Sequence, residues 1–256
     1  MFALFQQAGT IIFVLVTLLW IWSVLIKNVS IVDIFWGIGF VVVNSVYFLS
    51  NEQPDSRQFI IMILVALWGL RLAAYLAWRN IGKDEDYRYQ EFRQKFGPKR
   101  YWWFSYFQVF LLQGGLIMLI SLPLLAINSN TSELNLLDYL AILIWGIGFL
   151  FEAGGDYQLA KFKSNPANKG KVLNTGFWKY TRHPNYFGDA AIWVSYGLFC
   201  MSSGSYWPVI GTIIMILLLL KVSGVSLLEA TLKHSKPEYR EYMEKTSAFI
   251  PWIPKK

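Results

Sequence analysis

The sequence has little of the chemistry that metal and thiol enzymes use. Among 256 residues it contains one cysteine, Cys200, and two histidines, His183 and His234. A single cysteine excludes an intramolecular disulfide, and so few thiol and imidazole groups leave little for a zinc site or a thiol–imidazole pair. We therefore expect no metal centre.

The common nucleotide and hydrolase motifs are missing as well. No G-x-G-x-x-G, Walker loop, G-x-S-x-G or H-E-x-x-H occurs in the chain. This absence argues against the hydrolase and ATPase classes. It also means that any nucleotide is held without the motifs of soluble nucleotide-binding proteins.

Charge is scarce and apolar sequence is abundant. Charged residues make up 15% of the chain, hydrophobic residues 55% and aromatic residues 18%, and the mean hydropathy is +0.39. No globular core needs so much apolar sequence, so the composition predicts an all-α integral membrane protein. Seven apolar runs of spanning length predict seven transmembrane helices. These runs are 9–26, 30–49, 58–77, 102–127, 136–153, 185–203 and 207–228.

The basic residues alternate between the loops. Loop 78–101 holds seven of them and loop 161–182 holds six, whereas loop 128–135 holds none. Lys and Arg collect in cytoplasmic loops, so we expect a cytoplasmic C-terminus and an N-terminus on the opposite side. No Lys or Arg precedes the first apolar run, which we interpret as a retained helix and not as a signal peptide. The net charge of +7 follows from this orientation and is no argument for a nucleic-acid partner.

The stretch 181–189 holds polar and ionisable side chains that could form a site, at the point where the apolar run 185–203 begins. Pro184 suits the first turn of a helix, whose unpaired N–H groups favour anions. Asn185 and Asp189 stand four residues apart and share one face of that helix. Polar groups are costly in hydrocarbon unless they meet a partner or line a cavity, so we favour a ligand pocket over ordinary interhelical hydrogen bonding.

The helix before this stretch ends with two carboxylates on one face, Glu152 and Asp156. Carboxylates accept hydrogen bonds from ribose-like hydroxyls, which gives a ligand role. The alternative is a surface anchor paired with Lys161 or Lys163. Glu229, after the last apolar run, is expected at the same level as the opening of the ligand pocket that we favour at 181–189.

The second and third helices carry Asp33 and Arg71 at comparable depths from their cytoplasmic ends, so the two side chains can meet. They form either a structural ion pair or part of a site. A carboxyl paired with arginine stays ionised and cannot donate a proton, whereas one in a dry pocket without a cation can.

Trp-Gly-Ile-Gly-Phe occurs at 36–40 and again at 145–149. Small residues let helix backbones approach closely in membranes, so we interpret both copies as packing elements. The mixed-charge loop 83–93 is expected to be a solvated cytoplasmic helix or a lid.

The segment Arg-His-Pro-Asn-Tyr-Phe-Gly-Asp at 182–189, together with Ala-Phe-Ile-Pro at 248–251, resembles the steroid 5-alpha-reductase family over about 140–256. It is also similar to sterol C14-reductases and, more loosely, to isoprenylcysteine carboxyl methyltransferases. In the reductases the last three helices hold NADPH from the cytoplasmic side. The resemblance implies NADPH contacts for Asp156, Lys163, Lys171, Arg182, Asn185, Tyr186 and Asp189. To these we add Glu152, His183 and Glu229.

The N-terminal half matches that family less well. Val32 and Asp33 stand where a Gln-Glu pair is expected, and Trp68 replaces a tyrosine that binds the substrate ketone. Arg71 and Tyr75 do match family positions. We therefore name Asp33, Arg71 and Tyr75 as the catalytic candidates, with Asp33 and Tyr75 as possible proton donors.

The sequence thus predicts a membrane oxidoreductase with cofactor NADPH and its cofactor site facing the cytoplasm, in a bacterial inner membrane or the endoplasmic reticulum. Residues 1–135 form a four-helix half that binds an apolar steroid or lipid, and 136–256 form a three-helix NADPH-binding half with a cytoplasmic loop and tail. The expected reaction is reduction of a 3-keto-4-ene to the 5-alpha product. A methyltransferase that uses S-adenosylmethionine, or a sterol- or lipid-binding membrane protein without a reaction, is the alternative. Membrane lipids are the expected surroundings, and a monomer is compatible with the sequence.

Overall fold

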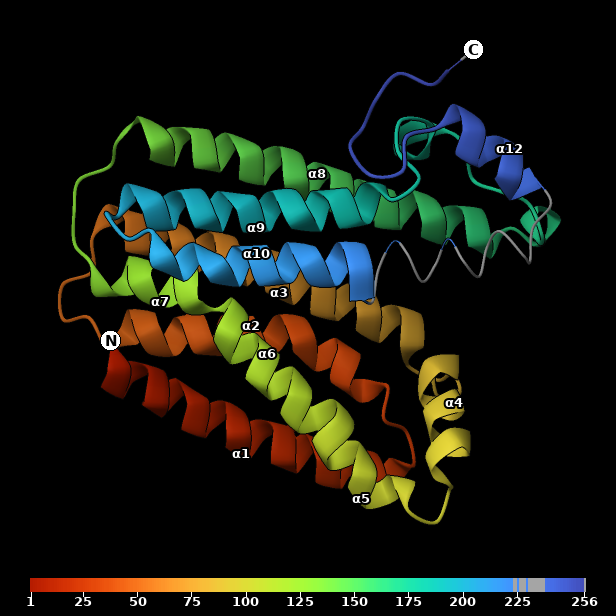
Figure 1. Ribbon diagram of the computed structural model, residues 1–256, viewed down its shortest axis with the longest axis horizontal. Coiled ribbons are helices and arrows are strands. Elements are labelled where there is room, and N and C mark those ends of the chain that lie inside the picture. The colour runs from red at the N-terminus through yellow and green to blue at the C-terminus, as the bar shows by residue number, and fades with distance from the viewer. Residues whose placement is uncertain (223–224, 226–228, 230–237, 256) are drawn as a thin grey trace. The chain divides into compact units, whose positions relative to one another are not determined.

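The computed structural model describes residues 1–222, 225, 229 and 238–255. Throughout these residues every regular element is helical and no strand occurs (Figure 1). The helices group into two compact units. The first comprises Met1–Glu133 with Ser203–Pro208, and the second comprises Leu134–Ser202 with Val209–Lys256.

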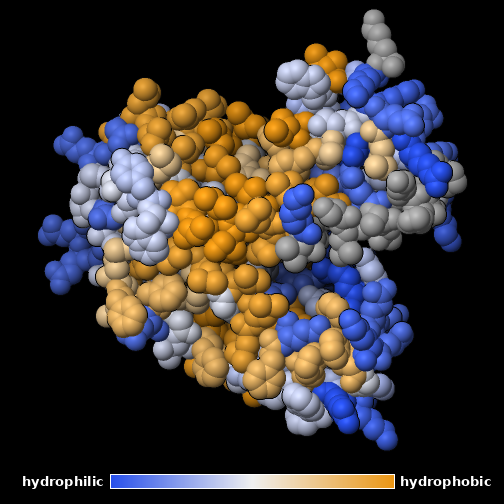
Figure 2. Space-filling model, in the orientation of Figure 1, coloured by the Kyte–Doolittle hydropathy of each residue, from blue (hydrophilic) through white to orange (hydrophobic). Residues whose placement is uncertain are grey.

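The described helices include five that are long and apolar enough to cross a membrane. They are Phe2–Ile26, Ile31–Leu49, Ser56–Asn80, Tyr101–Ile120 and Leu136–Ser164. Exposed tryptophans near their ends, such as Trp78 and Trp102, are typical of membrane interfaces. Figure 2 shows hydrophobic side chains over the long helices and hydrophilic ones around the short helices α4 (Tyr87–Phe96) and α12 (Glu238–Lys245). The all-helical membrane class is therefore confirmed.

The last two predicted spans are less apolar or shorter than expected. Helix α9 (Pro184–Ser202) is not among the five because Asn185, Asp189 and other polar residues lower its hydropathy. The run 207–228 begins as a shorter apolar helix, Trp207–Lys221, and residues 223–224 and 226–228 lie outside the described part of the chain. A count of seven spans and the orientation of the termini remain predictions.

The first unit is a set of antiparallel helices joined by short turns. It contains α1 (Phe2–Ile26), α2 (Ile31–Leu49), α3 (Ser56–Asn80), α4, α5 (Tyr101–Ser105), the π-helix η1 (Tyr106–Leu111), α6 (Leu112–Ile120) and α7 (Leu122–Ser129). The predicted single run 102–127 is interrupted at Ser121. Pro123 lies in the first turn of α7, where its missing N–H costs nothing, so the proline begins a new helix.

Helices α2 and α3 touch through their backbones. A Cβ added to Gly37 would lie 2.4 Å from the carbonyl oxygen of Gly69, and one added to Gly69 would lie 2.6 Å from that of Gly37. Gly39, in the same Trp-Gly-Ile-Gly-Phe segment, packs as closely on Ile117. The packing role predicted for the first copy of the segment is confirmed.

The second unit is built on two long helices, α8 (Leu136–Ser164) and α9, which lie side by side along most of their length (Figure 1). The remaining elements are the 3₁₀ turns η2 (Pro166–Asn168) and η3 (Gly176–Lys179), helix α10 (Ile210–Leu217), the π-helix η5 (Leu218–Val222) and α12, while the turn η4 (Trp207–Val209) begins in the first unit and ends in the second. A capping box from Asn135 and Asp138 starts α8. At the other end of α8, the loop through η2 and η3 leads into α9.

Candidate functional site

The second unit brings its polar groups together because α8 and α9 cross without side chains between them. A Cβ added to Gly188 would lie 2.4 Å from both the carbonyl oxygen of Gly148 and the backbone nitrogen of Glu152. Gly148 belongs to the second Trp-Gly-Ile-Gly-Phe copy, whose packing role is confirmed there, whereas a Cβ on Gly146 would meet nothing within 4 Å. The crossing sets Glu152 and the next turn of α8 against the first turns of α9.

Three acidic side chains are buried along this contact. Glu152, Asp156 and Asp189 are all less than a tenth exposed. The amide nitrogen Nδ2 of Asn185 donates a hydrogen bond to Oδ1 of Asp156 over 3.1 Å, and Asn185 itself is half-buried. Asn185 therefore makes the interhelical bond that the sequence offered as the alternative to a pocket, while its partial exposure leaves part of the amide accessible.

Helix α9 begins at Pro184, as the sequence predicted. Its start is pressed against α8, because a Cβ on Gly155 would lie 3.1 Å from the Pro184 ring and 3.2 Å from the backbone nitrogen of Asn185. The preceding turn is closed by Thr181, whose hydroxyl accepts a hydrogen bond from the backbone N–H of His183. The first turn of α9 is therefore held in place by its contact with α8 and by the hydrogen bond to Thr181.

Arg182 is buried and holds other parts of the chain. Its Nε and Nη2 donate to Oε1 of Glu229 over 2.8 and 2.6 Å. Its Nη1 donates to the carbonyl oxygens of Met243 and Thr246, over 3.0 and 2.6 Å. All three guanidinium nitrogens are therefore engaged within the protein, so Arg182 acts as a clamp between the α9 start, Glu229 and the C-terminal tail.

His183 lies beside this clamp. Its Nε2 is 3.3 Å from Oε1 of Glu229, and its ring stacks on that of Tyr186 at a centroid distance of 5.8 Å. Burial lowers the pKa of His183, an effect that the nearby carboxylate of Glu229 only partly offsets. The imidazole is therefore neutral at physiological pH, and its role is hydrogen bonding and not charge.

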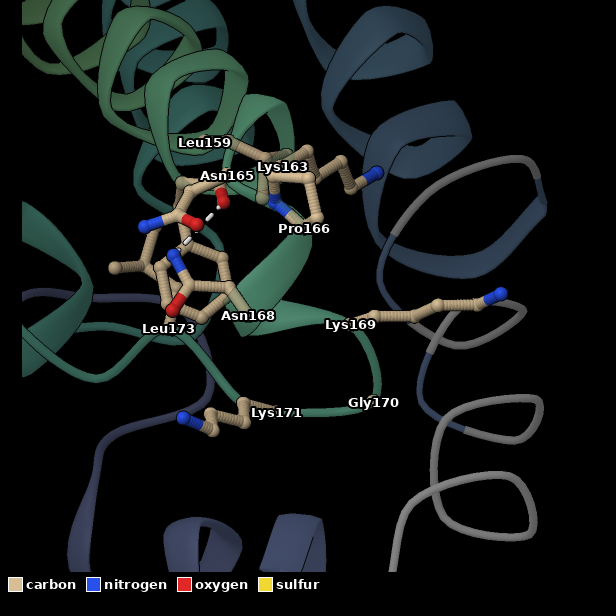
Figure 3. Close-up of a pocket in the computed structure, with 10 residues that line it drawn as sticks. Leu159, Lys163, Asn165, Pro166, Asn168, Lys169, Gly170, Lys171 and Leu173 are labelled. Carbon is tan, nitrogen blue, oxygen red and sulfur yellow. Dashed lines mark hydrogen bonds between the residues drawn. The ribbon is translucent and has the colours of Figure 1, made fainter.

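The loop after α8 forms an open pocket of about 450 Å³ (Figure 3). Its lining residues are Leu159, Phe162, Lys163, Asn165, Pro166, Asn168, Lys169, Gly170, Lys171 and Leu173. Three of these are lysines and none is acidic. Figure 3 shows the Lys163 and Lys169 side chains extending to one side and Lys171 to the other, so the cations flank the pocket from two directions. Two of the predicted cofactor lysines are thus brought together, and sequence reasoning missed the third, Lys169.

In the first unit, Asp33 finds its partners on α4. Its carboxylate oxygens accept from Nη2 of Arg88 over 2.7 Å and from the hydroxyl of Tyr89 over 2.6 Å. The sequence suggested Arg71 as the partner, but Asp33 is instead held by the loop that follows α3. Burial, followed by the charge of Asp33, raises the pKa of Tyr89 well above 10, so its hydroxyl keeps its proton.

The same end of the first unit is held by two further ion pairs, of Arg88 with Asp86 and of Arg93 with Glu85. Glu85 accepts from Nη2 of Arg93 over 2.8 Å and from the backbone N–H of Val29 over 2.9 Å, and the hydroxyl of Ser30 accepts from the backbone N–H of Asp86 over 2.7 Å. Loop 83–93 is therefore partly helical, as predicted, and is fastened to the turn between α1 and α2.

The other two catalytic candidates lie on α3. Arg71 and Tyr75 are half-buried, and Tyr75 packs against Trp78 with its ring 5.7 Å below the guanidinium carbon of Arg79. Trp68, one turn before Arg71, is fully buried and packs on Phe40 of α2. The tryptophan that replaces the family tyrosine is thus a core residue.

Comparison with known proteins places the chain in a class. Its residues 19–246 match the family described as "Protein of unknown function (DUF1295)", and the chain belongs to that family, which is steroid 5-alpha-reductase-like. It is 28% identical to Uncharacterized protein C594.04c of Schizosaccharomyces pombe, over 93% of this chain and 77% of that protein. It is also 32% identical to the Delta(14)-sterol reductase erg24 of the same yeast, over 30% of this chain and 21% of that protein. No solved structure matches.

Proposed function

We propose that the protein is a membrane reductase that uses NADPH to saturate the 4,5 double bond of a 3-keto-4-ene steroid, or of a similar lipid enone, giving the 5-alpha product. The family and the partial similarity to a sterol reductase support the reaction class. The proposal depends most on the arrangement of polar side chains at one end of α8 and α9. The α8–α9 crossing sets Asp156 and Asn185 two turns before the lysine-lined pocket at the end of α8.

These groups fit a phosphorylated dinucleotide. Lysine ammonium groups on two sides of a pocket that no carboxylate lines suit a ligand with more than one phosphate. Buried carboxylates next to a half-exposed amide, as at Asp156 and Asn185, suit ribose hydroxyls. When bound, NADPH supplies a hydride.

Within this proposal Arg182 and His183 act indirectly. Because the guanidinium is engaged by Glu229 and two backbone carbonyls, Arg182 positions Glu229 and the tail. The neutral imidazole of His183 supports the ring of Tyr186, which is half-exposed at the start of α9. Tyr186 then remains as a hydrogen-bonding side chain for the cofactor.

In the first unit, Arg71 and Tyr75 are the donors that would polarise a substrate carbonyl. Asp33 pairs with Arg88 and accepts from the Tyr89 hydroxyl, so both of its oxygens are engaged as acceptors. A donor aimed at a developing oxyanion in a dry site is typically worth a factor of about 100 in rate. Tyr75 is accordingly the candidate whose loss should cost most.

The proposal also includes the arrangement in the membrane. Seven spans, an outside N-terminus and a cytoplasmic C-terminus put the basic loop 161–182 in the compartment that supplies NADPH. The host membrane is a bacterial inner membrane or the endoplasmic reticulum.

The full-length protein in nanodiscs tests the activity. We expect NADPH oxidation that depends on an added 3-keto-4-ene and yields a product richer by two hydrogens. N185A removes the hydrogen bond to Asp156, so it should lower the melting temperature slightly, and it should also weaken NADPH binding. An N185A protein that binds NADPH normally but melts earlier would show that Asn185 only holds the helices together. NADPH oxidation that is indifferent to every enone supplied would reject the substrate class.

A further inference from the structure

The C-terminal tail displays apolar side chains on a fixed backbone. Ile250, Trp252 and Ile253 are 65%, 73% and 77% exposed, and the neighbouring Tyr180 is also exposed. We refer to these four residues as the C-terminal hydrophobic patch. In Figure 2, hydrophobic side chains lie close to the C-terminal end of the chain and are bordered by hydrophilic ones.

The backbone beneath the patch is fastened at several points. The N–H of Trp252 donates to the carbonyl of Tyr180 over 2.9 Å, the hydroxyl of Thr181 donates to the carbonyl of Phe249 over 2.8 Å, and the N–H of Arg182 donates to the carbonyl of Ser247 over 2.9 Å. Farther along, the N–H of Lys255 donates to the carbonyl of Lys245 over 2.9 Å. A tail held so closely does not fray, and its exposed isoleucines and tryptophan therefore form a preformed surface.

The surface is continuous with a membrane-spanning helix. Phe249, which leads into the patch, packs on Phe187 at a centroid distance of 6.1 Å, and Phe187 packs on Phe151 of α8 at 5.1 Å. Helix α8 exposes Leu150 and Tyr157 just before and after this level. Apolar side chains on this part of a spanning helix face the lipid, so the patch stands where acyl chains give way to headgroups.

The composition fits the boundary of a bilayer. Tryptophan and tyrosine favour this boundary because their rings are apolar and their N–H or O–H groups are polar. Lys179 and Lys255 flank the patch, and the ammonium group of Lys179 lies 5.9 Å from the ring centre of Tyr180. Lysine beside interfacial aromatic side chains is attracted to anionic headgroups.

We infer that the C-terminal hydrophobic patch docks into the headgroup boundary of an anionic bilayer and so presses the tail onto the start of α9. The tail carries the carbonyls that Arg182 holds, which links this lipid contact to the clamp around Glu229. The inference concerns the tail and the bilayer and is independent of the proposed reaction.

Nitroxide labels on the full-length protein in nanodiscs test this surface. Cys200 is buried and is replaced by alanine to give a cysteine-free background. Labels are then placed by I253C or W252C in the patch and, as the matched control, by E241C, whose native side chain is 70% exposed on α12. Frequent collisions of the nitroxide with oxygen show that it lies in the bilayer, and frequent collisions with a water-soluble nickel chelate show that it lies in the solvent.

We expect the labels at 253 and 252 to favour oxygen over nickel and the label at 241 to show the reverse. Adding phosphatidylglycerol to a phosphatidylcholine nanodisc should lower the nickel accessibility at 253 further. Labels at 253 and 252 as accessible to nickel as the label at 241 would overturn the inference and point to a protein partner for the patch. Insertion that is the same with and without phosphatidylglycerol would overturn the role given to the lysines.

Discussion

The carboxylate of Asp33 is bound on both oxygens by α4, by Arg88 on one and by the Tyr89 hydroxyl on the other, at 2.7 and 2.6 Å. Both oxygens therefore act as acceptors, and Asp33 fastens α4 to α2. The side chains of Arg88 and Asp33 are 34% and 15% exposed, so solvent screens the pair in part.

The first prediction concerns this pair. D33N and D33A should both lower the melting temperature, each costing about 1–2 kcal/mol, because either change removes one of the two carboxylates that pair with Arg88, the other being Asp86, and weakens or removes the acceptor of the Tyr89 hydroxyl. The double variant D33N/R88Q should lose less than the sum of the single changes. D84N, at an exposed aspartate of the same loop, is the control. Unchanged melting with activity falling in the order wild type, Asn, Ala would instead make Asp33 a proton donor.

The second prediction concerns the α8–α9 crossing. G188A places a methyl group 2.4 Å from backbone atoms of α8 and should cost about 1–3 kcal/mol or more in stability, with loss of NADPH binding as the helices separate. G146A has open space around it and should be neutral or stabilising, because alanine is the better helix former. Thermal melting of both variants measures the difference. Equal melting temperatures would contradict the backbone contact.

The third prediction concerns the pocket after α8. K163A, K169A and K171A should each weaken NADPH binding by roughly tenfold, the loss expected for one charge-assisted hydrogen bond, with a smaller effect on NADH. K83A, in the exposed loop before α4, should have no effect. Titration of both nucleotides at fixed salt provides the comparison. If the pocket variants bind NADPH as tightly as the wild type does, the phosphates bind elsewhere.

The fourth prediction is a pH dependence. Burial lowers the pKa of His183, so the folded protein binds this proton less readily than the unfolded chain, where histidine titrates near 6.5. As the pH falls below about 6.5 the unfolded state gains the proton first, and stability declines. H183Q cannot titrate and should show a smaller loss of melting temperature between pH about 7.5 and about 5.5.

The second histidine supplies the control for that measurement. His234 lies outside the residues that the structure describes, and H234Q measures how much of the pH dependence belongs to that histidine. If the pH dependence of the melting temperature disappears in H234Q and persists in H183Q, it belongs to His234, and the prediction for His183 is contradicted.

Several features could be predicted from the sequence because they depend on local pattern. The start of α9 follows from Pro184, and the close helix contacts follow from Gly37 and Gly148. The proximity of Asp156 and Asn185 follows from their places at the cytoplasmic ends of two predicted helices joined by the basic loop 161–182.

The partner of Asp33 could not be found in this way, because it depends on how loop 83–93 folds back. The sequence places Arg71 and Arg88 equally well near the cytoplasmic side, and only the turn through Asp86 decides between them. Arg182 shows the same limit. The family resemblance implied an NADPH contact for Arg182, but it gave no sign that the tail, more than sixty residues farther along the chain, supplies carbonyl acceptors to the guanidinium.

The most direct measurement is a competition among cofactors on the full-length protein in nanodiscs. The protein is mixed with equal amounts of NADPH, NADH and S-adenosylmethionine and is washed and denatured, after which the released molecules are identified by mass spectrometry. NADPH should predominate. Release of S-adenosylmethionine as the main species, or of NADH in amounts equal to NADPH, would contradict the assignment of this membrane protein as an NADPH-dependent reductase.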